Sequence, residues 1–293
     1  MTTTTRAGAV SQPGSDLPVR PAVATTFAAR TRWAVSDGWT LVRREIEHLV
    51  RQPGELASEF ILPAILVLLF GYIFGSAITV PGGGDYREYL MPGIFAMQAM
   101  MGIGVTITTV ASDLTLGVMD RFRSMPMARS AVPIGHTASS LLLGTLNFVA
   151  VAACALLVGW RPHLGLWPTV AGFGLLFLFR YAVGWIGVML GLLFKTEEAA
   201  DHAVPLLFPF TMVANTFVPT DGMPAWLRVI ADWNPISAIT NACRELWGNP
   251  GFRSGTDVAL PLQHPVLTSL IWCAAIIAVA VPVAVWRYGR ASR

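Results

Sequence analysis

Long apolar runs separated by short polar segments constrain this chain more than any other feature of its sequence. The first run covers residues 60–80 and consists almost entirely of apolar side chains. At about 1.5 Å of rise per residue, a helix of this length crosses the roughly 30 Å hydrocarbon core of a membrane. Hydrophobic residues make up 54% of the chain and charged residues 13%, which is far from the composition of a soluble domain. We therefore predict an all-α integral membrane protein.

Six such runs follow one another, and each is predicted to form a transmembrane helix. The fifth run is short and contains Pro205 and Pro209, so we expect it to be kinked. The six predicted spans are residues 60–80, 89–111, 133–160, 167–194, 203–218 and 266–286.

The region before the first span divides into two parts. Residues 1–29 are rich in Thr, Ala, Pro and Ser and contain no apolar run, so we expect a disordered tail rather than a secretory signal peptide. Apolar side chains then recur every three or four positions over residues 31–51, with charges on the other face. This pattern predicts an interfacial helix, although a soluble amphipathic helix shows it too. Its marker residues are Trp33, Trp39, Arg43, Arg44 and Glu47.

The longest connection, residues 219–265, contains two short helical periodicities. Neither is long enough to span a membrane, so we expect both to lie in or dip into the membrane interface. Trp226, Trp233 and Trp247 are the predicted interfacial anchors, because tryptophan is enriched at that depth.

Arginine and lysine are distributed unevenly between the two sets of loops. Both termini together with residues 113–130 and 195–202 contain fourteen of these residues, and the remaining loops contain five. The positive-inside rule therefore places the first set in the cytoplasm and residues 219–265 outside.

The sequence lacks the common motifs of catalysis and of nucleotide binding. No GxxxxGK[ST] phosphate loop is present, since the only lysine, Lys195, follows GLLF instead of a glycine-rich turn. HExxH and GxSxG are absent, and the five histidines and three cysteines are scattered without ligand spacing. We expect no catalytic, cofactor or metal site in this chain.

Arg180 lies near the middle of the fourth run, where a charge is costly. It could face a polar path through the membrane or bond to carbonyls freed at the broken fifth run. Alternatively, the predicted boundary is misplaced by a turn and the side chain reaches the headgroups. Gly184, Gly187 and Gly191 share one side of the same run and predict a close helix contact. Further candidates for a polar lining, each of which could equally bond to a neighbouring helix, are Gln98, Asn147 and Asn215.

The polar segment 113–130 reads DLTLGVMDRFRSMPMARS and lies between the second and third runs. Both charge signs surround an aromatic residue, and adaptable methionines flank a proline. This composition fits a short docking helix for a partner protein, although a plain solvated loop would look similar. The candidate contacts are Asp120, Arg121, Phe122, Arg123, Met125 and Pro126.

Taken together, these segments resemble the membrane permeases of type-2 ATP-binding cassette (ABC) exporters, and within them the daunorubicin/doxorubicin-resistance group. The resemblance covers about residues 30–286. Besides the amphipathic helix before the first span, it rests on LFGYIFG, DRFRSMPMARS, GLLFKTEEAADHAVPLLFPF and FVPTDGMPAWLRVIADWNPISAITNACRELWGN.

The resemblance implies a permease domain over residues 30–293 that exports hydrophobic or amphipathic drug-like compounds across the bacterial inner membrane. It implies a homodimer or heterodimer that docks two copies of a separate ATPase, which binds the ATP and magnesium. Residues 120–126 would be the coupling helix, and residues 33–51 the elbow helix. Two extracellular re-entrant helices would cap the exit, with the marker residues Trp226, Trp233, Asn234, Pro235, Arg244 and Glu245.

A lipid or polysaccharide exporter of the same family is the nearest alternative. An ion-coupled secondary transporter usually has internal repeats and titratable groups near mid-membrane, and here only Arg180 lies at that depth. Nucleic-acid binding is not expected despite the net charge of +3, because the basic residues lie at the ends of apolar runs.

Overall fold

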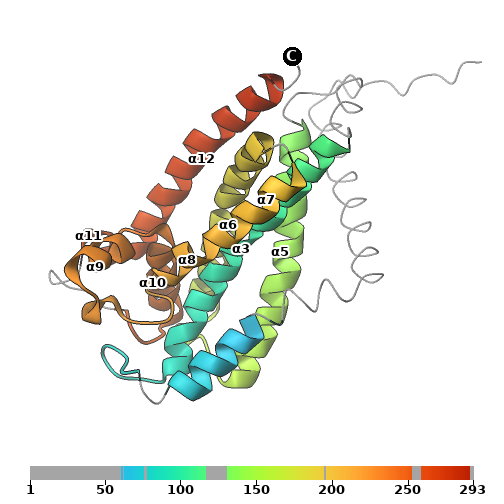
Figure 1. Cartoon of the computed structure of the whole chain (residues 1–293). Helices are drawn as coiled ribbons and strands as arrows, with labels where there is room; N and C mark the ends of the chain where they lie inside the picture. Colours follow the sequence, from blue (N-terminus) through green and yellow to red (C-terminus); the bar gives the residue numbers. More distant parts are fainter. Residues whose placement is uncertain are drawn as a thin grey trace, which may run out of the picture. The chain divides into compact units, whose positions relative to one another are not determined.

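The computed structural model describes residues 61, 63–75, 78–116, 131–194, 196–252 and 259–290. These residues belong to one compact unit, Arg44–Arg293, and their regular structure is entirely helical (Figure 1). The predicted all-α class is therefore confirmed. Several predictions lie outside the described residues: the tail 1–29, the elbow markers Trp33, Trp39, Arg43, Arg44 and Glu47, and the docking residues Asp120, Arg121, Phe122, Arg123, Met125 and Pro126.

Three helices in the described part of the chain are long and apolar enough to cross a membrane. They are α3 (Tyr86–Thr115), α6 (Leu166–Phe194) and α12 (Pro265–Arg290), and they contain the second, fourth and last apolar runs. Helix α5 (Ala131–Val158) overlaps the third run, and within it Leu143–Val158 forms a shorter apolar helix. A shorter apolar helix, Pro63–Ile73, lies within the first run and becomes π-helical in η1 (Leu69–Phe74). A total of six spans stays a prediction.

Local sequence signals place the start of α3. Gly82, Gly83 and Gly84 have positive φ angles, which glycine adopts without strain, and they turn the chain before the helix. Asp85 then caps α3, since its side chain accepts a hydrogen bond from the backbone N–H of Arg87.

Glycine residues bring α3 and α6 into close contact. A Cβ atom at Gly187 would lie 2.7 Å from Thr106 Cβ, and one at Gly191 would lie 2.7 Å from Val110 Cβ. The close contact predicted for this face of α6 is therefore confirmed at Gly187 and Gly191, because no larger residue fits there.

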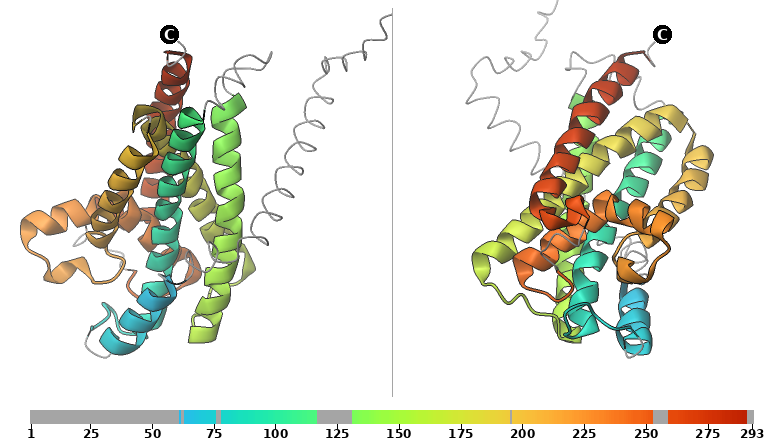
Figure 2. Two further views of the ribbon diagram at one scale, coloured as in Figure 1. Left: turned by 45° about the vertical axis from the view of Figure 1, so that its right-hand side comes forward. Right: turned by 90° about the vertical axis from the view of Figure 1, so that its left-hand side faces the viewer.

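Helices α3, α6 and α12 run in the same direction. Their C-terminal halves share one apolar cluster, and α5 runs back beside α3 (Figure 2). We call the end that contains the last turns of α3, α6 and α12 the C-terminal end, and the opposite one the loop end. Residues 113–116 and 196–202 are thus at the same end as the last turn of α12. The prediction of sidedness from arginine and lysine also put these two segments on the same side as the C-terminus. The shared cluster consists of Val110, Trp185, Val188, Leu192, Ala280, Ala284 and Tyr288.

The fifth apolar run forms an interrupted helix. It begins with α7 (Glu197–Ala203), continues through η2 (Val204–Leu206) and ends with α8 (Leu207–Met212). Thr196 caps the start by accepting a hydrogen bond from the Ala199 N–H, so helical structure begins before the predicted run 203–218. Two prolines, Pro205 and Pro209, coincide with the interruption.

Candidate functional site

The candidate site lies toward the loop end, around helices α9 (Ala225–Asp232) and α10 (Pro235–Trp247). Asn234 caps α10, because its Oδ1 accepts from the Ile236 N–H at 2.9 Å and Pro235 fits the first helical position. The Nδ2 group of Asn234 also donates to the carbonyl of Phe210, which joins α10 to α8. Gly248, with φ of 68°, ends the helix. Two of the predicted marker residues therefore set the position of α10.

Arg244 is the central side chain of this site and is only 1% exposed. Its Nε and Nη2 atoms donate to the Tyr89 carbonyl at 3.1 and 3.0 Å, and Nη2 also donates to the Asn215 carbonyl at 3.0 Å. Nη1 donates to Asn241 Oδ1 at 3.2 Å, and the guanidinium carbon lies 3.7 Å from the centroid of the Tyr89 ring. Arg244 therefore joins α10 to α3 and to the turn after α8 by charge-assisted hydrogen bonds and a cation–π contact.

A small cavity of about 40 Å³ lies beside Arg244. Two carboxylates line it and share one arginine: Arg228 Nη2 lies 3.3 Å from Asp221 Oδ1, and Arg228 Nε lies 3.7 Å from Asp232 Oδ2. Burial raises the pKa of Asp232, and the hydrogen bond from Thr220 and the charge of Arg228 oppose this increase. The full lining comprises Pro81, Tyr89, Asn215, Pro219, Thr220, Asp221, Arg228, Asp232, Asn241, Arg244, Gly251, Ala259 and Leu262.

Arg180, predicted from its place in the fourth run, is 3% exposed and lies between three helices. Its Nε donates to the Ser140 carbonyl of α5 at 3.0 Å, and Nη1 donates to the Gln98 carbonyl of α3 at 3.1 Å. Gly102 and Gly144 make room for it, because a Cβ atom on either glycine would overlap the guanidinium or its stem. The carbonyls that accept from Arg180 in these two bonds belong to α3 and α5 and not to the broken fifth run.

The other predicted lining residues lie at different places. Gln98 is buried next to Arg180 and accepts from it through the backbone, whereas Asn147 is buried on α5. Asn215 lines the cavity at Arg244. Whether any of these side chains contacts a transported compound stays a prediction.

The tryptophans of this region point in opposite directions. Trp226 and Trp233 are 68% and 54% exposed on one face of α9, together with Val229 and Ile230. Trp247, by contrast, is fully buried and donates from Nε1 to the Thr169 carbonyl. The prediction of an interfacial anchor at Trp247 is therefore wrong, because this face of α10 packs into the helix bundle. Its aromatic neighbours there are Phe95, Trp160 and Phe173.

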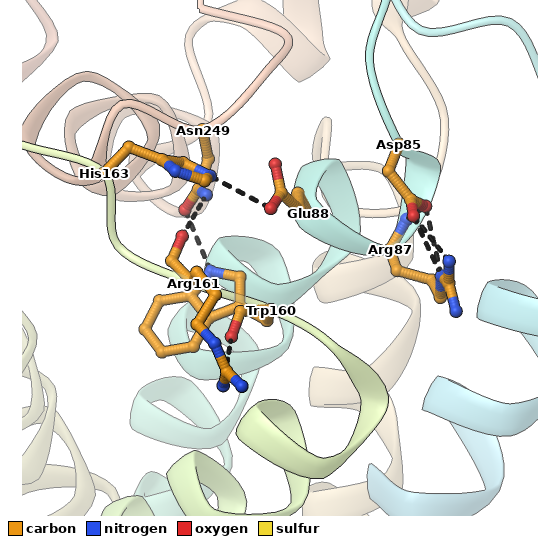
Figure 3. Close-up of polar contacts among 7 residues, drawn as sticks. All are labelled: Asp85, Arg87, Glu88, Trp160, Arg161, His163 and Asn249. Atoms are coloured by element: carbon orange, nitrogen blue, oxygen red, sulfur yellow. Dashed lines mark hydrogen bonds and ion pairs between the residues drawn. The ribbon is translucent and has the colours of Figure 1, made fainter.

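A polar network at the loop end was missed by the sequence reasoning (Figure 3). Trp160 Nε1 donates to Asn249 Oδ1 at 2.9 Å, and Asn249 Nδ2 donates to the Arg161 carbonyl at 3.1 Å. His163 Nε2 lies 2.9 Å from Glu88 Oε1, which joins the α5–α6 connection to α3. Asn249 follows the glycine that ends α10, which was a readable turn signal, but its partner 89 residues earlier was not readable.

Within the described ranges, no group of three His, Cys, Asp or Glu side chains is placed to bind a metal. The predicted marker Glu245 is half-buried on α10, next to Arg244 in the sequence. The site is thus a set of buried, hydrogen-bonded contacts between helices with one small polar cavity among them.

Comparisons with known proteins give a consistent result. The sequence profile of the ABC-2 type transporter family matches residues 37–246. The chain is 30% identical over 254 residues to the daunorubicin resistance ABC transporter permease protein DrrB1 of Streptomyces coeruleorubidus, covering 85% of this chain and 88% of the relative. It is 26% identical over 226 residues to the putative transport permease ycf38 of Cyanophora paradoxa, covering 73% and 75%. It is also 25% identical over 165 residues to the probable multidrug ABC transporter permease YbhR of Escherichia coli strain K12, covering 56% and 44%.

Proposed function

Because the chain belongs to the ABC-2 type transporter family, we propose that it is the permease subunit of an ATP-driven exporter of hydrophobic or amphipathic drug-like compounds. The observation that carries this proposal is the 30% identity to a daunorubicin resistance permease over 85% of the chain. Three helices in the described part of the chain are long and apolar enough to cross a membrane, which fits such a subunit.

The proposed complex contains two permease chains and two copies of an ATPase that binds ATP and magnesium. The sequence has no phosphate loop of its own, so the energy source would be the partner. Residues 120–126 follow α3 closely and would dock the ATPase. We assign the C-terminal end to the cytoplasm, together with both termini, because the sequence segments assigned to that side contain most of the arginine and lysine residues.

The contacts of α3 suggest how motion would pass through the subunit. This helix has 30 residues and is about 45 Å long. Its last turn is followed by the proposed docking segment, and its first turns hold Arg244 of α10 through Tyr89. Between these points it packs on Gly187 and Gly191 of α6 and bonds to Arg180. A push at the docking segment would therefore move α3 as a rigid lever and reach α10 at the other end.

ATP-dependent transport is the direct test of this function. The purified chain is reconstituted in lipid vesicles with and without its ATPase, and movement of a fluorescent anthracycline is followed. We expect movement only when both the ATPase and ATP are present. Movement driven by a proton gradient in vesicles without the ATPase would instead support an ion-coupled transporter.

The docking role of residues 120–126 gives a second prediction. The double substitution Arg121→Glu with Phe122→Ala is expected to release the ATPase in a pull-down while membrane insertion stays intact, because it reverses a charge and removes the aromatic contact. Arg287→Glu in the last turns of α12 is the control, since it reverses a charge at the same end outside the docking segment. If the double variant retained the ATPase as the control does, the docking role would be wrong.

A lipid or polysaccharide exporter of the same family is the second candidate. It shares the ATPase, the docking segment and the helix arrangement, and it differs only in the transported compound. A fluorescent lipid in the same vesicles therefore separates a lipid exporter from a drug exporter. Only a lipid exporter would move the lipid and leave the anthracycline in place.

A further inference from the structure

Two buried acceptor atoms at the cavity beside Arg244 have no hydrogen-bond donor among the described residues. They are Asn215 Oδ1 and Asp232 Oδ1, on residues that are each 5% exposed. Both residues line the same cavity. Buried polar atoms normally have a hydrogen-bond partner. Two unsatisfied acceptors at one cavity therefore indicate a bound group that donates a hydrogen bond to each of them.

Protein contacts hold the backbone of Asn215 and one carboxylate oxygen of Asp232. The Asn215 backbone is held on both sides: its N–H donates to Ser237 Oγ, and its carbonyl accepts from Tyr89 Oη and Arg244 Nη2. Thr220 and Arg228 both interact with the Asp232 carboxylate, and the contact with Arg228 is to Oδ2 at 3.7 Å. The hydroxyls of Thr240 and Ser269 also lack partners, but these residues do not line the cavity. Asn215 Oδ1 and Asp232 Oδ1 therefore differ from these hydroxyls, because both unsatisfied acceptors belong to residues that line the cavity.

Size and charge narrow the class of ligand. A cavity of about 40 Å³ admits a group of the size of a water molecule or an ammonium, but not a ring. Two acidic and two basic side chains line it. Arg244 directs its donors toward two backbone carbonyls and Asn241, and Arg228 directs its donors toward Asp221 Oδ1 and Asp232 Oδ2, so that Asp232 Oδ1 is left without a cationic donor in the described part of the chain. A cation with several N–H donors would donate to both unsatisfied acceptors. A positive charge is favoured because one of the two acceptors belongs to a carboxylate.

We propose that this cavity binds the primary ammonium group of an amphipathic amine, with Asn215 Oδ1 and Asp232 Oδ1 as its acceptors. The proposal rests on the function proposed above and assigns to that exporter a class of ligand. The amine can come from a transported compound or from the ethanolamine headgroup of a membrane lipid. In both cases the ammonium enters the cavity and the apolar part stays outside it.

Equilibrium binding to the full-length chain in nanodiscs, without the ATPase, tests the proposal. Radiolabelled dodecylamine, dodecyltrimethylammonium and dodecanol are compared in phosphatidylcholine nanodiscs. We expect dodecylamine to bind at least about tenfold more tightly than either of the others, since one lacks N–H donors and the other lacks the charge. Equal binding of dodecanol or of dodecyltrimethylammonium would overturn the proposal without requiring any variant to fold.

Two variants locate the site. Asp232→Asn and Asn215→Leu are each expected to weaken dodecylamine binding about tenfold, which corresponds to one lost charge-assisted hydrogen bond. Asp201→Asn on α7 is the matched control and should bind as the native chain does, because Asp201 is exposed and lies outside the cavity. Tryptophan fluorescence on heating verifies that each variant is folded. Native binding by folded Asp232→Asn would contradict the assignment.

Two further arms separate the sources of the amine and the two proposals. Dodecylamine binding is compared in nanodiscs with and without phosphatidylethanolamine. Weaker binding in the presence of this lipid would support a lipid amine at the site, and unchanged binding would support a transported amine. Because the ATPase is absent, loss of amine selectivity with intact ATP-driven anthracycline movement overturns only this inference. Amine binding with no ATP-driven movement would overturn the proposed function instead.

Discussion

Replacing Arg244 by leucine is expected to lower the free energy of unfolding by about 3–5 kcal/mol, the cost of disrupting a buried, hydrogen-bonded charge site. The substitution removes donors to the carbonyls of Tyr89 and Asn215 and to Asn241 Oδ1, together with the contact over the Tyr89 ring. Leucine cannot donate to any of these groups. Helix α10 would therefore lose its polar connection to α3.

The measurement is the thermal unfolding midpoint in detergent, followed by tryptophan fluorescence, with size-exclusion chromatography of the same samples. Arg87→Leu is the matched control, because Arg87 and its ion-pair partner Asp85 are both partly exposed, so that their pair is worth at most about 1 kcal/mol. Arg244→Lys should be intermediate, since lysine keeps the charge but lacks the fork of donors. A midpoint for Arg244→Leu equal to that of Arg87→Leu would show that these contacts contribute little.

The second large effect is expected at Gly144, which faces Arg180. Glycine to alanine in a helix normally stabilises it by up to about 1 kcal/mol. Here a methyl group would overlap Nε and Cδ of Arg180 and force the guanidinium away from the Ser140 carbonyl. Because displacing an arginine within a membrane helix costs several kcal/mol, we expect Gly144→Ala to destabilise the protein by about 2–4 kcal/mol.

A double-mutant cycle separates this clash from other causes. Arg180→Ala is destabilising by itself, but adding Gly144→Ala to it should cost little, because the methyl group then enters space that the side chain has left. Gly174→Ala on α6 is the control, since no neighbouring side chain or other helix in the described part of the chain lies within 4 Å of its Cβ position, and a small gain in stability is expected. Additive effects in the cycle would exclude the contact between Gly144 and Arg180 as the cause.

Features that depend on neighbouring residues were predicted well. The all-helical class follows from the apolar runs, and the close face at Gly187 and Gly191 follows from their spacing of one helical turn. Family membership was also readable, because the matching segments are continuous in sequence. Even the break in the fifth run coincides with Pro205 and Pro209.

Features that depend on which helix faces join were not predicted. Trp226, Trp233 and Trp247 looked equivalent in the sequence, yet two are exposed and Trp247 is in the aromatic core. Arg180 was correctly singled out as a costly charge, but its partners on α3 and α5 were not identified. A charged side chain in an apolar run indicates that a hydrogen-bond partner is required, but the sequence does not indicate which residue provides it.

The sequence by itself indicated the helical class, the long apolar segments and the need to satisfy each buried charge, because these follow from local side-chain patterns and from the thickness of a membrane. Only the tertiary structure decided that Arg244 bonds to the carbonyl of Tyr89, which is 155 residues away. It also decided that Asn215 and Asp232 share a cavity. Such contacts depend on how α3, α8, α9 and α10 pack together, and the pattern of residues within any one helix does not contain that information.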